Sequence, residues 1–159
     1  MIEVYRLIEF SSLDPRPKAD LEEHKGTIRG FMQQMSPDWA YSEEDIKDLI
    51  DNRWQAVIFA LDSEGNAVGF GTLRRLDDSG IFEFERAYVD PVHRKKGLYK
   101  EILRRRMDIA RKLDAKSLTT SVNINKRHLK YLRSIGFKPV GMSGALMELK
   151  LDISDNQFN

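Results

Sequence analysis

The chain has 159 residues and no cysteine, and its 26 basic and 25 acidic residues leave a net charge of +1. The lack of cysteine excludes disulfides, thiolate metal sites and a cysteine nucleophile. No apolar run approaches the roughly 18 residues of a membrane-spanning helix, and no secretory leader is recognisable, so we expect a cytoplasmic protein without a membrane contact. The length fits one domain over 1–153, followed by a polar tail over 154–159.

The hydrophobic pattern of the first half predicts both strands and helices. Ser42 begins a weak capping-box pattern before a short acidic helix. An Asp- and Gly-containing turn at 62–66 separates two apolar runs and predicts a hairpin. The elements expected here are a strand at 2–10, a helix at 18–35, the helix after Ser42, and strands at 54–61 and 67–73.

The second half continues the mixed α/β order without repeats. Helix 98–113 carries a broad apolar stripe, which indicates that one side packs on a sheet. Asn125 is expected to cap a short helix that Gly136 ends. The elements expected here are strands at 81–89, 117–122, 137–140 and 145–151, with helices between them.

The segment 89–103 is the most informative part of the chain. It joins an apolar strand, through Pro91 and a basic loop containing Gly97, to the start of a helix. The free N–H groups of a helix N-terminus bind anions, and the cations Arg94, Lys95 and Lys96 add ionic attraction. This order predicts a phosphate site that suits a pyrophosphate.

Charge is concentrated in the same region. Residues 94–116 hold ten lysines and arginines against three acids, whereas the rest of the chain has 16 bases and 22 acids. A local anion site explains this pattern, and so does a solvated helix face. A nucleic-acid or anion-binding module built on 94–116 is the alternative from another class. The low overall charge and the few interleaved aromatics argue against nucleic acid as a partner.

Two motifs resemble the GNAT superfamily of N-acetyltransferases, which use acetyl-coenzyme A. The first is Val-x-Pro-x-x-Arg-x-x-Gly followed by a helix, present as Val89, Pro91, Arg94 and Gly97. The second is an Asn eleven residues before Gly-Phe, present as Asn125 and Gly136-Phe137. The resemblance implies a GNAT-like fold, in which helices flank a central mixed, mostly antiparallel sheet.

The resemblance also implies a coenzyme site. Backbone N–H groups of Lys95, Lys96, Gly97, Leu98 and Tyr99 would hold the pyrophosphate of coenzyme A, with Arg94 and the lysines pairing with phosphates. Ala87, Tyr88 and Val89 would offer main-chain groups to the pantetheine arm, and the N–H near Val89 would hold the oxyanion. Asn125 would lie beside the coenzyme or would only cap its helix. No metal is implied.

For catalysis, the resemblance implies direct acetyl transfer to an amine in a ternary complex. Glu83 stands where many members place the general base, with Glu85 in reserve; an exposed strand glutamate paired with a cation is the plainer alternative. The family's tyrosine acid is replaced by Leu132, one residue after Tyr131, so Tyr131 acts as the acid or has a packing or substrate-contact role. Tyr99 occupies a position where a small residue is usual, so its ring must pack under the loop or crowd the pyrophosphate.

The acceptor is not identified by the sequence, and a small-molecule amine and a protein or peptide amine both remain possible. Trp39 and Tyr41 are candidate substrate contacts or core residues. The acids Glu43, Glu44, Asp45 and Asp48 would attract a cationic acceptor or form a solvated face. A non-catalytic family member that binds acetyl-coenzyme A and a homodimer are further possibilities.

Overall fold

A computed structural model describes residues 4–11, 13, 18–124 and 127–153. The strands are β1 (Arg6–Ser11), β2 (Trp54–Leu61), β3 (Ala67–Arg75), β4 (Ile81–Phe84), β5 (Ala87–Val89), β6 (Ser117–Asn123), β7 (Lys138–Ser143) and β8 (Leu146–Asp152). The helices are α1 (Lys25–Met35), α2 (Glu43–Asp48), α3 (Leu98–Lys112) and α4 (Arg127–Ser134). Three short helical turns are η1 (Lys18–His24), η2 (Leu49–Arg53) and η3 (Pro91–His93).

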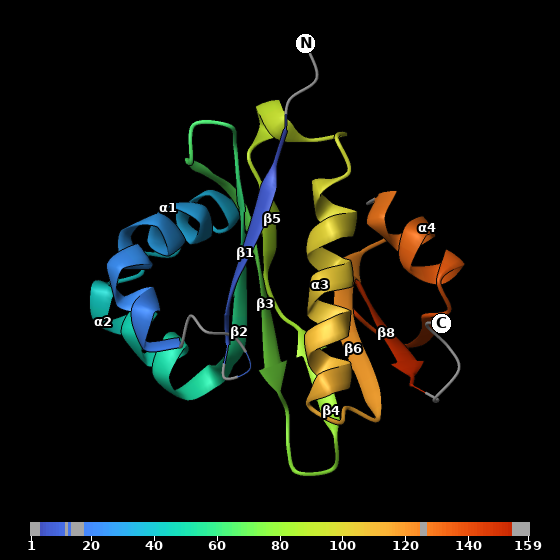
Figure 1. Ribbon diagram of the computed structural model, residues 1–159. Coiled ribbons are helices and arrows are strands. Elements are labelled where there is room, and N and C mark those ends of the chain that lie inside the picture. Colours follow the sequence, from blue (N-terminus) through green and yellow to red (C-terminus); the bar gives the residue numbers. More distant parts are fainter. Residues whose placement is uncertain (1–3, 12, 14–17, 125–126, 154–159) are drawn as a thin grey trace.

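The strands form one eight-stranded sheet in the order β1-β2-β3-β4-β6-β8-β7, with β5 also paired to β3. Strands β4 and β6 run parallel, and the other pairs run antiparallel. The helix α3 connects the end of β5 to β6 (Figure 1). The sheet is therefore mixed and mostly antiparallel, which confirms the expected fold class.

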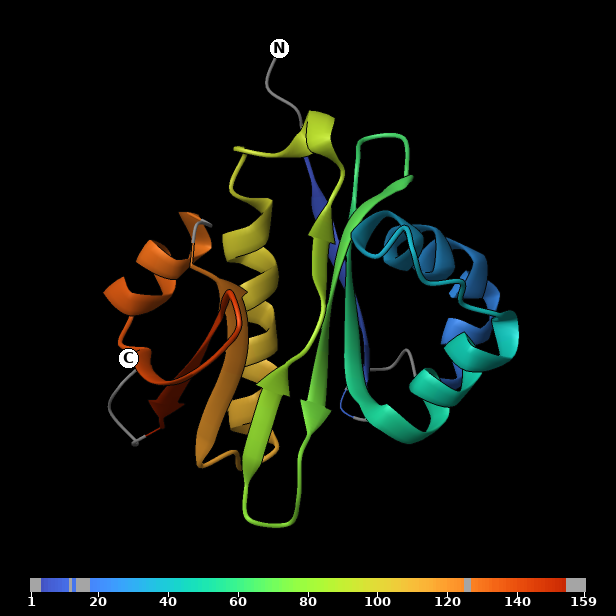
Figure 2. The same cartoon turned by 180° about the vertical axis from the view of Figure 1, so that it is seen from behind.

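Helices cover both faces of the sheet, with α1 and α2 on one face and α3 and α4 on the other (Figures 1 and 2). Each face has its own hydrophobic core, and these two cores supply most of the apolar burial that stabilises the fold. The core under α3 and α4 includes Ile58, Leu73, Phe82, Ile102 and Phe137. The core under α1 and α2 includes Phe10, Ile28, Ile46, Trp54 and Phe59. Among the described residues, no helix is long and apolar enough to cross a membrane.

Local sequence signals place most elements within a few residues of their predicted ends. Ser42 accepts a hydrogen bond from Asp45 N, and the Asp45 carboxylate accepts one from Ser42 N, so the capping box is confirmed. Gly136 adopts a left-handed φ of 110°, as expected of a residue that ends a helix. The predicted Asn125 cap and the tail 154–159 lie outside the described residues.

Two predicted elements are interrupted. The helix expected at 18–35 begins as the η1 turn and becomes regular only at Lys25. The single strand expected at 81–89 is two strands, β4 and β5, separated at Glu85 and Arg86. The register of β3 shifts by one residue between these strands, from Gly71 opposite Ala87 to Arg74 opposite Glu83. An extra residue on one strand is a β-bulge, and here it lies beside the candidate site.

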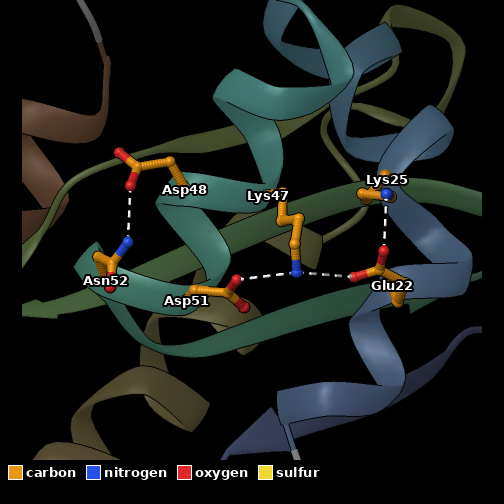
Figure 3. Close-up of polar contacts among 6 residues, drawn as sticks. All are labelled: Glu22, Lys25, Lys47, Asp48, Asp51 and Asn52. Carbon is orange, nitrogen blue, oxygen red and sulfur yellow. Dashed lines mark hydrogen bonds and ion pairs between the residues drawn. The ribbon is translucent and has the colours of Figure 1, made fainter.

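Polar contacts on the surface link α2 to the η1 and η2 turns (Figure 3). Lys47 lies 3.0 Å from Asp51 and 3.7 Å from Glu22, while Asn52 donates to Asp48 at 2.6 Å. Exposed pairs of this kind contribute little to stability, because solvent and salt screen them. Of the acids Glu43, Glu44, Asp45 and Asp48, Asp48 thus has a partner on the surface, and their role toward a cationic acceptor stays a prediction.

Close packing of α3 on β3 gives a stability prediction at Gly71. A Cβ at this position would collide with Cγ2 of Ile102 and lie 3.1 Å from Nε of Arg106. We expect Gly71→Ala to lower the free energy of unfolding by about 1–3 kcal/mol in urea denaturation, because overpacking forces neighbours to move. Gly30→Ala is the control, since its Cβ meets nothing within 4 Å. Because Gly30 lies in the middle of α1, Gly30→Ala should raise the free energy of unfolding by about 0.5–1 kcal/mol. Equal effects of both changes would contradict the close contact.

Candidate active site

The loop between β5 and α3 ends in an open helix N-terminus. Lys95 and Gly97 have left-handed φ values of 64° and 83°. The cap residue is Gly97, which has no side chain to accept a hydrogen bond from the first N–H groups of the helix. The first helical bond runs from Glu101 N to Gly97 O at 3.1 Å. The N–H groups of Leu98, Tyr99 and Lys100 therefore have no acceptor within the helix. These donors and the helix dipole favour an anion at this position.

The side chain of Arg94 secures the loop. Its Nε donates to Val89 O at 2.7 Å, and its guanidinium lies 5.3 Å from the ring centre of Tyr88. The loop is held from its other side by Tyr5, whose hydroxyl lies 2.8 Å from His93 Nδ1. The neighbouring Lys95 is exposed. Arg94 thus contributes to loop geometry in addition to the positive charge predicted from the sequence.

One edge of β5 carries unpaired backbone donors. On its other edge, Asp90 N donates to Val68 O and Thr72 N donates to Arg86 O, at 2.8 and 2.9 Å. Backbone groups alternate between the two edges of an antiparallel strand, so Ala87 and Val89 point their N–H groups away from β3. In the part of the chain that the structure describes, no strand pairs with this second edge.

The free edge of β5 faces a fork in the sheet. The parallel pairing of β4 and β6 ends at Phe84 opposite Thr120, where Thr120 Oγ1 also donates to Phe84 O at 3.1 Å. Beyond this point β5 follows β3, whereas β6 follows β8 (Figure 2). We call the separation of β5 from the Ser121–Asn123 end of β6 the fork. An extended ligand could pair with the N–H groups of Ala87 and Val89 there, as an added strand would.

Glu83 points to the sheet face that α1 and α2 cover. Its carboxylate lies 3.6 Å from Nη1 of Arg74, the opposing residue on β3. Burial raises the pKa of Glu83, and the charge of Glu85 raises it further, although nearby arginines act in the opposite direction. A half-buried carboxylate with a raised pKa has a character suited to a general base near neutral pH.

Glu85 shares the face of Glu83, as the strand period predicts, but its carboxylate is occupied. Arg53 donates to Oε1 through Nε at 2.7 Å, and Trp54 Nε1 donates to Oε2 at 3.1 Å. The alternative of a strand glutamate paired with a cation applies to Glu83 as well, because Arg74 lies 3.6 Å from it. The role of Glu83 as the base, with Glu85 in reserve, stays a prediction.

The aromatic residues of α3 and α4 contact each other across the helix interface. The ring of Tyr99 stacks on His128 of α4 with centroids 3.5 Å apart. Burial raises the pKa of Tyr99. Nζ of Lys100 lies 4.8 Å from the ring centre of Tyr131, and Leu132 is fully buried. Tyr131 thus has a packing role, and its role as an acid stays a prediction.

Trp39 and Tyr41 lie in the connection between α1 and α2. The ring of Trp39 is 63% exposed, and its centroid is 6.4 Å from that of Tyr41. Tyr41 packs partly into the core and accepts a long hydrogen bond of 3.5 Å from Arg86. Because Tyr41 packs against the core under α1 and α2, it lies on the same face of the sheet as Glu83.

The triple arginine of α3 does not form one basic face. Arg104 pairs with Glu101 and Arg105 pairs with Glu9, at 3.1 and 3.4 Å, while Arg106 is buried. This arrangement weakens the nucleic-acid alternative, which requires exposed cations on one surface. The sequence reasoning missed the burial of Arg106. Its spacing offered a signal, because Arg106 lies four residues from both Ile102 and Ala110 in the apolar stripe.

Comparison with known proteins identifies a family. The model of the acetyltransferase (GNAT) family matches residues 19–137. No curated protein matches the chain in sequence.

Solved structures share the fold at low identity. The PaiA N-acetyltransferase of Thermoplasma acidophilum, in complex with coenzyme A, is 17% identical with a TM-score of 0.63, over 94% of this chain and 99% of that chain. A GNAT-family acetyltransferase of Staphylococcus aureus is 14% identical with a TM-score of 0.66, over 95% and 100%. The aminoglycoside N-acetyltransferase AAC(6')-Iy, in complex with CoA, is 15% identical with a TM-score of 0.66, over 90% and 93%.

Proposed function

Because the chain belongs to the GNAT family of acetyltransferases, we propose that it transfers an acetyl group from acetyl-coenzyme A to a primary amine. One observation carries the proposal: the free edge of β5 leads through a single loop to the open N-terminus of α3. A strand edge suits the amide groups of a pantetheine arm, and a helix N-terminus suits a pyrophosphate. The two features lie in the order in which coenzyme A presents these groups.

Each step of the transfer has a candidate group in this chain. The lone pair of the amine nitrogen forms a bond to the thioester carbonyl carbon, and the C=O π electrons move to oxygen. The N–H group near Val89 stabilises this oxyanion, while that of Ala87 pairs with the pantetheine arm. Glu83 takes the proton that the nitrogen loses. When the C=O bond re-forms, the C–S bond breaks and its electron pair leaves on sulfur, which then takes a proton from Tyr131 or from water.

The surroundings of Glu83 bear on the acceptor. Arg74, Arg53 and Arg86 all lie close enough to lower the pKa of Glu83. Arg53 and Arg74 are paired with Glu85 and Glu83, so this group carries one excess positive charge. That charge favours an amine beside an anionic group, as in an amino acid or peptide, over a polycation. We propose acceptors with such an anionic group, approaching past Trp39 and Tyr41.

Release of coenzyme A thiol measures the reaction directly, because the chain has no cysteine and contributes no thiol background. We expect thiol release from acetyl-coenzyme A to rise in the presence of an amine from a panel of amino acids, peptides, aminoglycosides and spermidine. Mass spectrometry of the product should show one added acetyl group on nitrogen. Coenzyme binding without release above the uncatalysed rate for any amine would instead support the non-catalytic alternative.

A further inference from the structure

Arg106 is an arginine in the hydrophobic core. It lies on the sheet-facing stripe of α3, and 1% of its surface is exposed. Its guanidinium lies 4.5 Å from the ring centre of Phe84, the last residue of β4. A buried charge is unfavourable unless contacts compensate it, so its neighbours show what it does.

The guanidinium binds the backbone of the bulge. At the bulge Arg86 N donates to Thr72 Oγ1. The carbonyl oxygen of Thr72 therefore does not receive the hydrogen bond that Arg86 N would donate to it in a regular antiparallel pair. Nη1 of Arg106 donates to that oxygen at 3.2 Å and to Arg86 O at 3.3 Å. Arg106 therefore braces the residue that directly precedes Ala87, whose N–H faces the fork.

The positive charge of Arg106 is not neutralised. In the described part of the chain, Nε has no hydrogen-bond partner and no carboxylate pairs with the guanidinium. Glu83 and Glu85 are on the opposite face of the sheet, and Arg86 turns its side chain to Tyr41 there. Burial lowers the pKa of Arg106 to about 10, so the side chain remains charged at neutral pH.

The titratable group that faces Arg106 on its own helix is Tyr99. The two residues are seven apart, two turns along one face of α3. The charge of Arg106 acts to lower the pKa of Tyr99, while Tyr131 acts to raise it. Tyr99 in turn stacks on His128, so this face of α3 reaches α4.

We propose that Arg106 supplies a positive potential at the fork that stabilises the coenzyme A thiolate formed in acyl transfer. The inference rests on the proposed function, because it concerns the same site. When the C–S bond breaks, its electron pair remains on sulfur, and a buried cation nearby lowers the energy of that anion. Arg106 acts through the potential and the bulge and does not need to touch the sulfur, so it is a positioning residue.

The test is the thiol pKa of bound coenzyme A, followed by the ultraviolet absorbance of its thiolate. The thiolate signal is specific, since the chain has no cysteine. A parallel titration with desulfo-coenzyme A removes the contribution of the tyrosines. In the wild-type protein we expect the bound thiol to have a pKa about one unit below that of free coenzyme A.

Three variants test the contribution of the charge. Arg106→Gln removes the charge and keeps a polar amide on a shorter side chain, and we expect the bound thiol pKa to rise by about one unit relative to the wild type. Arg106→Met serves if the glutamine variant does not fold, since apolar replacement of a buried charge is often tolerated. Arg104→Gln is the matched control, because it removes one charge from the exposed side of the same helix. It should leave the thiol pKa unchanged.

Several outcomes would overturn the proposal. If the bound thiol in the wild-type protein has the pKa of free coenzyme A, Arg106 does not stabilise the thiolate, and this result needs no variant. An unchanged pKa in Arg106→Gln would leave only a bracing role, and an equal rise in Arg104→Gln would indicate a general charge effect. Calorimetry with coenzyme A precedes the titration: absence of binding would contradict the proposed function itself, whereas binding with an unshifted thiol would contradict only the role of Arg106.

Discussion

Gly97→Asp is expected to abolish the stabilisation of the protein by coenzyme A. Ligand at 100 times its Kd stabilises the folded state by about 2.7 kcal/mol, which corresponds to roughly 5–10 °C in Tm for a chain of this size. The aspartate would place a carboxylate beside the N–H groups of Leu98 and Tyr99, where it competes with the pyrophosphate and repels it. Differential scanning fluorimetry with and without ligand measures the loss.

Gly65→Asp is the matched control. Gly65 has a φ of 85°, close to the 83° of Gly97, and lies in the turn between β2 and β3. Both variants therefore carry the same backbone strain and the same new charge. The control should have a lower Tm without ligand but keep the full coenzyme shift. A full shift in Gly97→Asp would show that the pyrophosphate does not bind at the N-terminus of α3.

Glu83→Gln is expected to lower kcat by about 100-fold or more near neutral pH, the usual contribution of a general base. The affinity for coenzyme A should not change. Because the pKa of Glu83 is raised, wild-type activity should fall with decreasing pH at a value above that of an ordinary glutamate, as the base becomes protonated. The variant should lack this acid limb, and its defect should shrink at high pH, where the acceptor amine is already neutral.

Glu85→Gln is the matched comparison for Glu83→Gln, because it also replaces one carboxylate with an amide. Glu85 is bound by Arg53 and Trp54, so this variant should lose about 1–3 kcal/mol of stability and keep most of its kcat. Stopped assays of initial rate and urea denaturation separate the two effects. The reverse pattern, a slow Glu85→Gln and an unaffected Glu83→Gln, would assign the base to Glu85.

Local signals in the sequence are sufficient to predict the loop between β5 and α3. The left-handed conformation at Gly97 and the helix that starts at Leu98 depend on residues within the segment itself. The capping box at Ser42 is local in the same way. Such features follow from backbone preferences that neighbours in sequence determine.

The features that the sequence did not reveal depend on distant partners. The bulge at Glu85 and Arg86 requires Thr72 from β3, and the occupied carboxylate of Glu85 requires Arg53 and Trp54. Arg106 looks like part of a basic run until the fold buries it against Phe84. Tertiary contacts of this kind override the local pattern, which is why the single strand expected at 81–89 was wrong at its centre.

Amide hydrogen exchange at Ala87 and Val89 tests the central claim most directly, because these N–H groups are proposed to pair with the pantetheine arm and with the thioester oxygen at its end. Saturating acetyl-coenzyme A should slow the exchange of both amides by about tenfold or more, as new hydrogen bonds protect them from opening. Adenosine 3',5'-bisphosphate, which lacks the arm, should leave both rates unchanged. Unaltered exchange of Ala87 and Val89 with bound acetyl-coenzyme A would contradict the account of the fork as the acyl-transfer site.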